Sequence, residues 1–179
     1  MKKIIYYVAS SLDGFIAGKD DDVSMFLFKG NGVDKYLEDL KEFKTVVMGR
    51  RTYEFGYKFG AVPGQPSPAY PHMKHYIFSN NLELDNLHKN VEIKPMNVEE
   101  VIKIRESADS DIYLCGGGQL AKWFLENGLI DLLKIKLNPI TLGSGIPLFG
   151  GTEIAKRWNL IKTETFEHGL LMLTYEISQ

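Results

Sequence analysis

The stretch that most constrains the fold is a short apolar run that leads through three glycines into an amphipathic run. Ile112–Cys115 has the length and composition of a buried strand, and Gly116-Gly117-Gly118 follows it directly. The next apolar side chains recur at the spacing of one helix face: Leu120, Ala121, Phe124 and Leu125. A strand, a glycine turn and a helix let backbone N–H groups point at a phosphate. Glycine has no Cβ to block close approach, and a helix N-terminus carries a partial positive charge.

The glycine triplet alone does not identify a ligand. It matches neither the G-x-G-x-x-G pattern of dinucleotide-binding turns nor the Gly-Lys-Ser/Thr ending of a P-loop. A tight strand-to-helix turn without any ligand is an equally good interpretation of these residues. The rest of the chain has to distinguish the two.

Composition excludes several classes of function. The chain has 179 residues and a formal net charge of -2, which predicts one domain over residues 1–179 and gives no basic footprint for nucleic acid. No apolar run approaches the roughly 20 residues that a membrane span needs. Cys115 is the single cysteine, so no internal disulfide can form, which suits a reducing compartment. We therefore expect a cytoplasmic protein with a small-molecule partner and no nucleic-acid or membrane partner.

A second strand-to-glycine junction carries two arginines. Thr45–Met48 predicts a strand, and Gly49-Arg50-Arg51-Thr52 follows it at the start of a predicted helix. Arginine matches phosphate geometry in a bidentate way, and the threonine hydroxyl can donate to an oxygen. The alternative, surface arginines at a helix start, is weakened because cations there oppose the helix dipole.

Residues 75–79 predict a third strand, and its end is polar. Ser79-Asn80 can bind a ribose or a phosphate, or can simply form a polar turn. The preceding segment, residues 56–70, is rich in Gly, Pro and aromatic side chains and predicts an ordered loop. His72 and His75 lack a supporting His or Cys cluster, so no metal site is predicted.

The N-terminal third predicts a strand, an acidic loop and a helix. Residues 3–10 are rich in Ile, Tyr and Val and predict a central strand. Asp20–Asp22 predicts a solvated loop, because the glycine and glutamate of a calcium-binding EF-hand loop are missing. A helix from Asn31 or Gly32 has an apolar face formed by Val33, Tyr36, Leu37, Leu40 and Phe43.

The C-terminal half supplies the remaining elements. Val91–Lys94 predicts an edge strand, and Asn97 has the pattern of a helix N-cap with a glutamate three residues on. Two strand-like runs, residues 158–167 and 170–178, meet at His168-Gly169 and predict a closing hairpin.

Strands that alternate with helices before a closing hairpin predict an α/β fold with a mainly parallel sheet. The carboxyl ends of its strands, at Ser10, Met48, Ser79 and Cys115, gather at the edge where ligands bind. Three of these four ends carry glycines, arginines or small polar groups. This convergence favours a cofactor site over a turn without a ligand.

Several segments, in the same order and over nearly the full length, carry a family resemblance: Val8–Ala17, Val46–Glu54, Ile77–Asn80, Cys115–Gly118, Leu129–Asp131 and Pro139–Phe149. The chain resembles the dihydrofolate reductase superfamily, and more closely its bacterial branch related to the RibD C-terminal reductase domain of riboflavin biosynthesis. The resemblance implies a three-layer α/β fold of the dihydrofolate reductase type, with a mainly parallel central sheet and a C-terminal antiparallel hairpin.

The resemblance implies NADPH as hydride donor. By position, Ala9 and Ile16 line the nicotinamide pocket, and Ser79 and Asn80 face the adenine ribose. The residues expected at phosphate groups, including the adenosine 2′-phosphate, are Gly49, Arg50, Arg51 and Thr52. The residues expected around the pyrophosphate are Cys115, Gly116, Gly117, Gly118, Gln119 and Leu120. In the family a cis peptide joins the first two of these glycines, a bond that is rare outside proline.

The implied activity is an NADPH-dependent oxidoreductase that reduces a small carbonyl, imine or pterin-like compound. Dihydrofolate reductase and 5-amino-6-(5-phosphoribosylamino)uracil reductase are the two models for it. Reduction needs a proton as well as a hydride. Dihydrofolate reductases place a carboxylate on the first helix, where Asp34 is the candidate. An acid that merely suits the helix start is the alternative.

Two departures from the family pattern argue against folate as the substrate. Lys74 stands near the place of an arginine, and Ala121 replaces a tyrosine. A non-catalytic NADP(H)-binding module of the same fold is the alternative to an enzyme. The resemblance also implies a homodimer, for which the closing hairpin can supply an interface.

Overall fold

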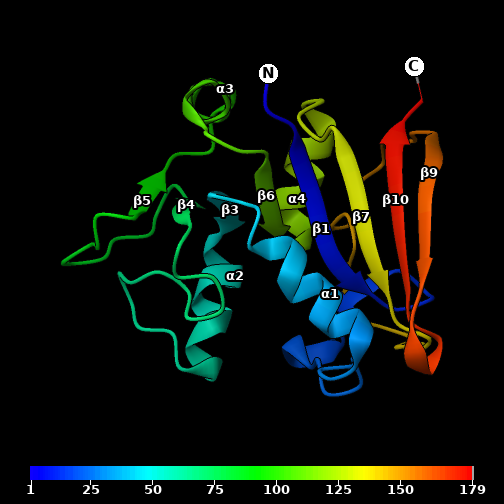
Figure 1. Ribbon diagram of the computed structural model, residues 1–179. Helices are drawn as coiled ribbons and strands as arrows, with labels where there is room; N and C mark the ends of the chain where they lie inside the picture. Colours follow the sequence, from blue (N-terminus) through cyan, green and yellow to red (C-terminus); the bar gives the residue numbers. More distant parts are fainter. Residues whose placement is uncertain (179) are drawn as a thin grey trace.

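The structure is a computed structural model that describes residues 1–178, and its centre is an eight-stranded sheet (Figure 1). The strand order is β5-β4-β3-β6-β1-β7-β10-β9, and β2 and β8 form a separate two-stranded sheet. The strands are β1 Ile4–Ser10, β2 Phe15–Ala17, β3 Thr45–Gly49, β4 Lys74–Phe78, β5 Val91–Lys94, β6 Ile112–Gly116, β7 Leu132–Leu137, β8 Ile146–Pro147, β9 Trp158–Thr165 and β10 Leu171–Ile177.

The helices connect the parallel strands. They are α1 Asn31–Leu40, α2 Arg50–Phe55, α3 Val98–Ser107 and α4 Gly118–Glu126, with short 3-10 turns η1 Lys19–Asp21, η2 Gly56–Phe59 and η3 Glu167–Gly169. Within residues 1–178, none of these helices is long and apolar enough to cross a membrane.

The pairing confirms the mainly parallel sheet and the closing hairpin. The six strands from β5 to β7 in the strand order run parallel to their neighbours, and β5 forms the predicted edge. β10 pairs antiparallel with β7, and β9 pairs antiparallel with β10. Consequently the chain enters the sheet at the start of β1 and leaves it at the end of β10 on the same side, so both termini lie together (Figure 1).

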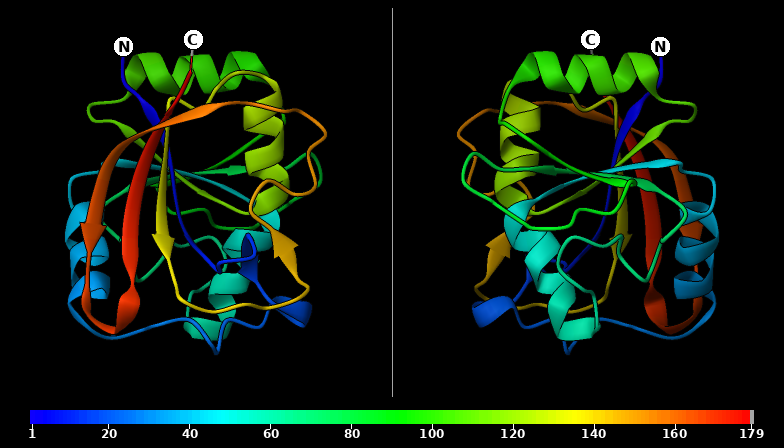
Figure 2. Two further views of the ribbon diagram at one scale, coloured as in Figure 1. Left: turned by 90° about the vertical axis from the view of Figure 1, so that its right-hand side faces the viewer. Right: turned by 90° about the vertical axis from the view of Figure 1, so that its left-hand side faces the viewer.

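Helices cover both faces of the sheet and produce three layers, with α1 and α4 on opposite sides (Figure 2). Side chains alternate between the faces along each strand. Tyr6 and Leu114 are buried in one core cluster with α3 and α4, whereas Tyr7 and Tyr113 are buried in the other with α1 and α2. Consecutive residues of β1, and likewise of β6, therefore pack against opposite helical layers.

Two local details differ from the sequence prediction. Leu37, included in the predicted apolar face, is 46% exposed. The reason is that α1 meets the hairpin at Gly32, where an added Cβ would lie 2.7 Å from a side-chain carbon of Leu170. Leu37 therefore lies at the rim of the contact between α1 and the hairpin. Asn97 caps α3 as predicted, accepting a hydrogen bond from the Glu99 N–H, but Glu100 pairs with lysines instead of closing a capping box.

A buried histidine organises the loop before β4. The His75 side chain is fully buried, and its ring stacks on Tyr70 at 5.5 Å between centroids. Nε2 accepts a hydrogen bond from the Ser67 N–H at 3.0 Å, so Nδ1 carries the proton and donates to the Met73 carbonyl at 2.9 Å. Both ring nitrogens are thus used within the protein, and the ring ties the ordered loop to the strand.

The buried ring predicts a pH-dependent stability. Burial lowers the pKa of His75 from its ordinary 6.5 to about 4, because the charged ring would lose solvation. The unfolded chain therefore binds this proton more tightly than the folded one. The stabilisation is complete above about pH 6.5 and declines as pH falls towards 4, by at most roughly 3 kcal/mol.

Urea unfolding of the wild type and of His75→Gln, followed between pH 4 and 7.5, measures this effect. We expect the stability difference between the two proteins to shrink as the medium becomes acidic. A difference that stays constant across this range would contradict the assignment of the neutral ring.

Candidate active site

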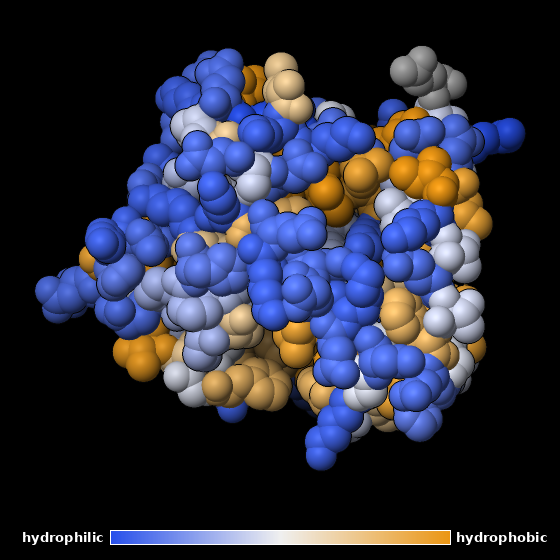
Figure 3. All heavy atoms as spheres, in the orientation of Figure 1, coloured by the Kyte–Doolittle hydropathy of each residue, from blue (hydrophilic) through white to orange (hydrophobic). Residues whose placement is uncertain are grey.

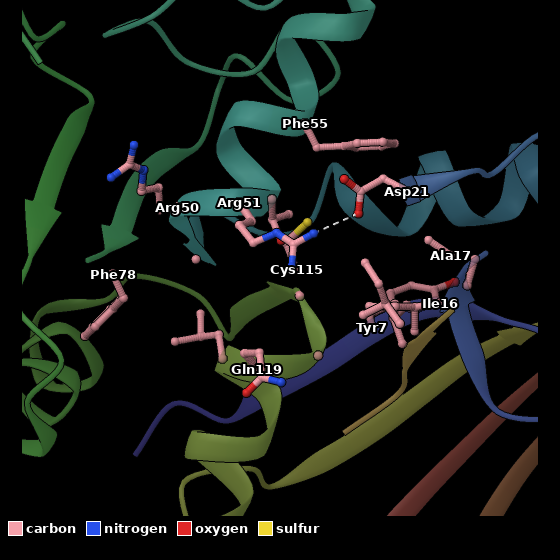
Figure 4. A pocket seen from close by; sticks show the side chains of 18 of the residues that line it. Tyr7, Ile16, Ala17, Asp21, Arg50, Arg51, Phe55, Phe78, Cys115 and Gln119 are labelled. Atoms are coloured by element: carbon pink, nitrogen blue, oxygen red, sulfur yellow. Dashed lines mark hydrogen bonds and ion pairs between the residues drawn. The ribbon is translucent and has the colours of Figure 1, made fainter. Parts of the chain in front are cut away.

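A cavity of about 450 Å³ lies at the carboxyl ends of β1, β3 and β6, where the parallel topology gathers the strand termini (Figure 4). Most residues predicted to form the site line this cavity: Ala9, Ile16, Gly49, Arg50, Arg51, Thr52, Cys115, Gly117, Gly118, Gln119 and Leu120. The others that line it, absent from the sequence prediction, include Tyr7, Asp21, Val23, Tyr36 and Tyr113.

The start of α4 offers free backbone donors to the cavity. Gly117 is the N-cap, and no side chain forms a cap hydrogen bond there. The first turn of a helix has N–H groups without intrahelical partners and a partial positive charge. A Cβ on Gly117 would lie 3.1 Å from Thr52 Oγ1, so the bare backbone keeps that hydroxyl close to the helix start. This wall of the cavity suits an anionic group.

The three glycines of the triplet, Gly116–Gly118, have different structural roles. The Gly116–Gly117 peptide bond is cis, as the family resemblance implies, and Gly116 has a φ of 110°. Gly118 is required by packing, because an added Cβ would lie 2.3 Å from the Pro147 carbonyl oxygen. The packing at Gly118 is that of a tight strand-to-helix turn, whereas Gly117 also lines the cavity.

The two arginines point in different directions (Figure 4). Arg50 Nε donates to Glu54 at 2.8 Å, and its Nη1 lies 3.4 Å from both the carbonyl and the side-chain oxygen of Asn81. Arg51 pairs instead with Asp21 of η1, with 3.2 Å between Nη2 and Oδ1. Asp21 was predicted to be a solvated loop acid, but it lines the cavity and bridges to α2.

The polar turn after β4 lies beside the cavity without lining it. Ser79 Oγ donates to Asn81 Oδ1 at 3.0 Å, and Asn80 Oδ1 accepts from the Met96 N–H at 2.9 Å. Neither side chain, nor Gly116, is among the lining residues. Asn81 connects this turn to Arg50, so the turn and the guanidinium form one polar end of the site.

The structure does not bring Asp34 together with the other candidates. Its side chain is exposed near the start of α1 and does not line the cavity. The carboxylate that α1 turns inward is Asp39, which accepts from the Tyr7 hydroxyl at 3.0 Å and pairs with Lys35 and Lys134. Burial pushes the pKa of Asp39 upward, but the hydrogen bonds from both lysines outweigh it and leave that pKa below its ordinary value.

Tyrosine hydroxyls occupy the enclosed end of the cavity. The Tyr36 and Tyr113 oxygens are 2.7 Å apart, and the Tyr70 hydroxyl lies 3.6 Å from Cys115 Sγ. Burial raises the pKa of Tyr36 and of Tyr113, so both remain protonated in neutral solution. Sequence reasoning missed this group because α1 and β6 are 77 residues apart at this contact.

Comparisons with known proteins identify the family and the fold. A family model described as the RibD C-terminal domain matches residues 2–172. The uncharacterized protein YyaP of Bacillus subtilis is 29% identical, over 97% of this chain and 94% of that protein. A solved protein of Shewanella sp. PV-4, named for riboflavin biosynthesis, superposes over the full length of both chains with a TM-score of 0.82 and 26% identity.

More distant structures share the fold. A Thermotoga maritima deaminase and 5-amino-6-(5-phosphoribosylamino)uracil reductase gives a TM-score of 0.75 at 17% identity, over 99% of this chain but 57% of that one. Dihydrofolate reductase from Enterococcus faecalis, solved with NADP(H), gives 0.66 at 17% identity over 99% and 97% of the two chains. The predicted dihydrofolate reductase-like fold is thereby confirmed.

The single cysteine provides a reporter for this cavity. Burial raises the pKa of the Cys115 thiol, and hydrogen bonds involving Tyr113 and Tyr70 offset part of that effect. Because the thiolate is the reactive form, we expect iodoacetamide to alkylate Cys115 at pH 7.5 at least about tenfold more slowly than it alkylates the unfolded chain. Mass spectrometry of time points with and without urea measures both rates. Equal rates would show that the thiol is neither buried nor perturbed.

Proposed function

Because the chain belongs to the RibD C-terminal domain family, whose model covers residues 2–172, we propose that it is an NADPH-dependent reductase. The substrate would be a small carbonyl, imine or pterin-like compound. One observation carries the proposal: the uncapped start of α4 and the arginines of α2 line the same cavity. This combination suits a phosphorylated dinucleotide.

The residues present fit such a cofactor. The amides of Gly117–Leu120 and the Thr52 hydroxyl would hold the pyrophosphate, and Cys115 and Gly116 would position that turn. Arg50, beside the Ser79–Asn81 turn, would take the adenosine 2′-phosphate. Ala9 and Ile16 would line the nicotinamide pocket, and Gly49 would leave room between β3 and α4. When bound, the cofactor supplies a hydride; the chain binds, orients and shields it from water.

Arg51 can contact the pyrophosphate without leaving Asp21. Only its Nη2 donates to Asp21, at 3.2 Å, and the guanidinium has further N–H donors. The Arg51 side chain is 76% exposed, so these donors can reach a ligand in the cavity. In this proposal Arg51 strengthens the binding of both NADPH and NADH, whereas Arg50 distinguishes between them.

The cofactor assignment is tested by calorimetric titration of the purified protein with NADPH and with NADH. We expect a clear preference for NADPH, and slower alkylation of Cys115 in its presence. Binding of neither nucleotide would reject the proposal. Binding of NADPH without turnover of any reducible compound would favour the alternative, a non-catalytic NADP(H)-binding module.

Two arginine variants test the division of roles. Arg50→Ala should weaken NADPH about 10- to 100-fold with little effect on NADH, because it removes a charge-assisted contact to a group that NADH lacks. Arg51→Ala should weaken the binding of NADPH and of NADH by the same factor, which should be smaller than the loss of NADPH binding in Arg50→Ala. Calorimetry gives all four dissociation constants.

Arg157→Ala is the matched control, since it removes an exposed arginine outside the cavity. The loss of nucleotide affinity in this variant measures the effect of the change in net charge by itself. Equal losses for NADPH and NADH in Arg50→Ala would remove the assignment of the 2′-phosphate to this residue.

A homodimer is a further part of the proposal. β9 is an edge strand with Leu160 and Ile161 about half exposed, and hydrophobic side chains gather over it on the molecular surface (Figure 3). An uncovered edge strand can pair with another copy of itself. Sedimentation of the wild type should give a dimer, and Ile161→Lys should shift it towards a monomer. A monomeric wild type at micromolar concentration would exclude this interface.

A further inference from the structure

The enclosed end of the cavity has no free carboxylate. Among the described residues that line the cavity, Asp21 is the sole acid, and it is paired with Arg51. Asp39 lies behind Tyr7 and is neutralised by Lys35 and Lys134. A protonated heterocycle would therefore find no counter-ion beside the tyrosines, and a buried cation without a partner is costly.

A buried lysine lies beside Tyr36 at the same end. Lys136 is 6% exposed, and its Nζ donates to the Leu27 carbonyl at 3.1 Å. Within residues 1–178 it has no acidic partner within ion-pair distance, and Nζ lies 5.4 Å from the centre of the Tyr36 ring. Burial lowers the pKa of Lys136, but whenever it is protonated it favours negative charge near Tyr36 and disfavours a second cation.

The Tyr36 and Tyr113 hydroxyls retain a hydrogen for a ligand. Each hydroxyl carries one hydrogen, and their mutual bond at 2.7 Å uses one of the two. The remaining acceptor nearby is Cys115, whose sulfur is a weak one. The Tyr7 hydroxyl, by contrast, already donates to Asp39. Of the tyrosines that line the cavity, Tyr36 is thus the one that can turn its hydrogen towards a ligand while Tyr113 supports its oxygen.

We propose that Tyr36, held by Tyr113, hydrogen-bonds the oxygen of an uncharged or anionic carbonyl substrate during its reduction. This inference rests on the proposed function and narrows it. A hydride supplied by the bound cofactor would form the new C–H bond at the carbonyl carbon, and the π pair of the C=O bond would move onto oxygen. That oxygen would take a proton from water, and the cofactor would remain in its oxidised form. Tyr36 stabilises the negative charge on that oxygen.

The surroundings of Tyr36 suit a permanent donor. Its hydroxyl stays protonated through the neutral range, so the hydrogen bond does not depend on pH there. The ring is held edge-on against Tyr7 at 4.8 Å between centroids, which restricts its orientation. Loss of one preorganised donor to an oxyanion lowers kcat by about 10²-fold or more in characterised enzymes.

A series of para-substituted benzaldehydes tests the charge preference. The probes are 4-nitrobenzaldehyde, 4-formylbenzoate and 4-formyl-N,N,N-trimethylanilinium, which share the reacting group and differ in charge. Calorimetry in the presence of NADP⁺ measures their binding without turnover. We expect the neutral and anionic aldehydes to bind, and the cationic aldehyde to bind at least about tenfold more weakly than the neutral one.

Tyr36→Phe tests the hydrogen bond. We expect about tenfold weaker binding of 4-nitrobenzaldehyde, about 10²-fold lower kcat and an unchanged dissociation constant for NADPH. Tyr76→Phe is the matched control, because it removes a hydroxyl from β4 outside the cavity. If Tyr36→Phe fails to fold, the aldehyde series on the wild type still tests the proposal.

The outcomes separate this inference from the proposed function. Failure to bind NADPH rejects both. If NADPH binds, tighter binding of the cationic aldehyde, or no binding of any aldehyde, overturns the substrate class. Unchanged binding and kcat in Tyr36→Phe overturn its role. If Asp34→Asn loses turnover and Tyr36→Phe does not, the catalytic role belongs to the Asp34 carboxylate.

Discussion

The contact on which the site depends is the close approach of the end of β8 and the residues that follow it to the start of α4. The Pro147 carbonyl lies where a side chain on Gly118 would have to be, and Gly150 meets the same turn. From this contact Leu148 donates its N–H to the Gly14 carbonyl and accepts from the Tyr6 hydroxyl. One bare stretch of backbone therefore fixes β1, β2 and α4 relative to each other. Each of these three elements supplies residues that line the cavity.

The cavity has two electrostatic halves. At one end, helix amides and guanidinium groups face the space, and the acids nearby are already engaged. At the other end, phenolic hydroxyls and a thiol are kept protonated by burial. The first half suits a ligand that brings its own negative charge. The second suits a group that becomes charged only as it reacts, because neutral donors need no counter-ion beforehand.

Local patterns in the sequence were sufficient for the fold and for most residues that line the amide and guanidinium end of the cavity. A strand and the glycines or arginines that follow it are only a few residues apart in the sequence, so a local pattern reveals them. Parallel pairing then brings the ends of different strands together. The tyrosine end of the cavity depends on distant partners and on helical phase. A one-residue shift turns a side chain about 100° around a helix. Asp34 and Tyr36 are two residues apart and therefore project about 200° apart around α1, which places Asp34 in solvent and Tyr36 in the cavity. The Asp21–Arg51 pair likewise joins segments that no local pattern relates.

Both chain ends lie on the side of the sheet opposite to the cavity, since β1 runs towards it and β10 runs away from it (Figure 1). A tether attached at either end would leave the mouth of the cavity unobstructed. The architecture thus tolerates fusion to a carrier, or capture on a solid support, without steric cost to ligand exchange. For the same reason, a neighbouring module joined at a terminus would have to extend around the sheet before it could reach the cavity.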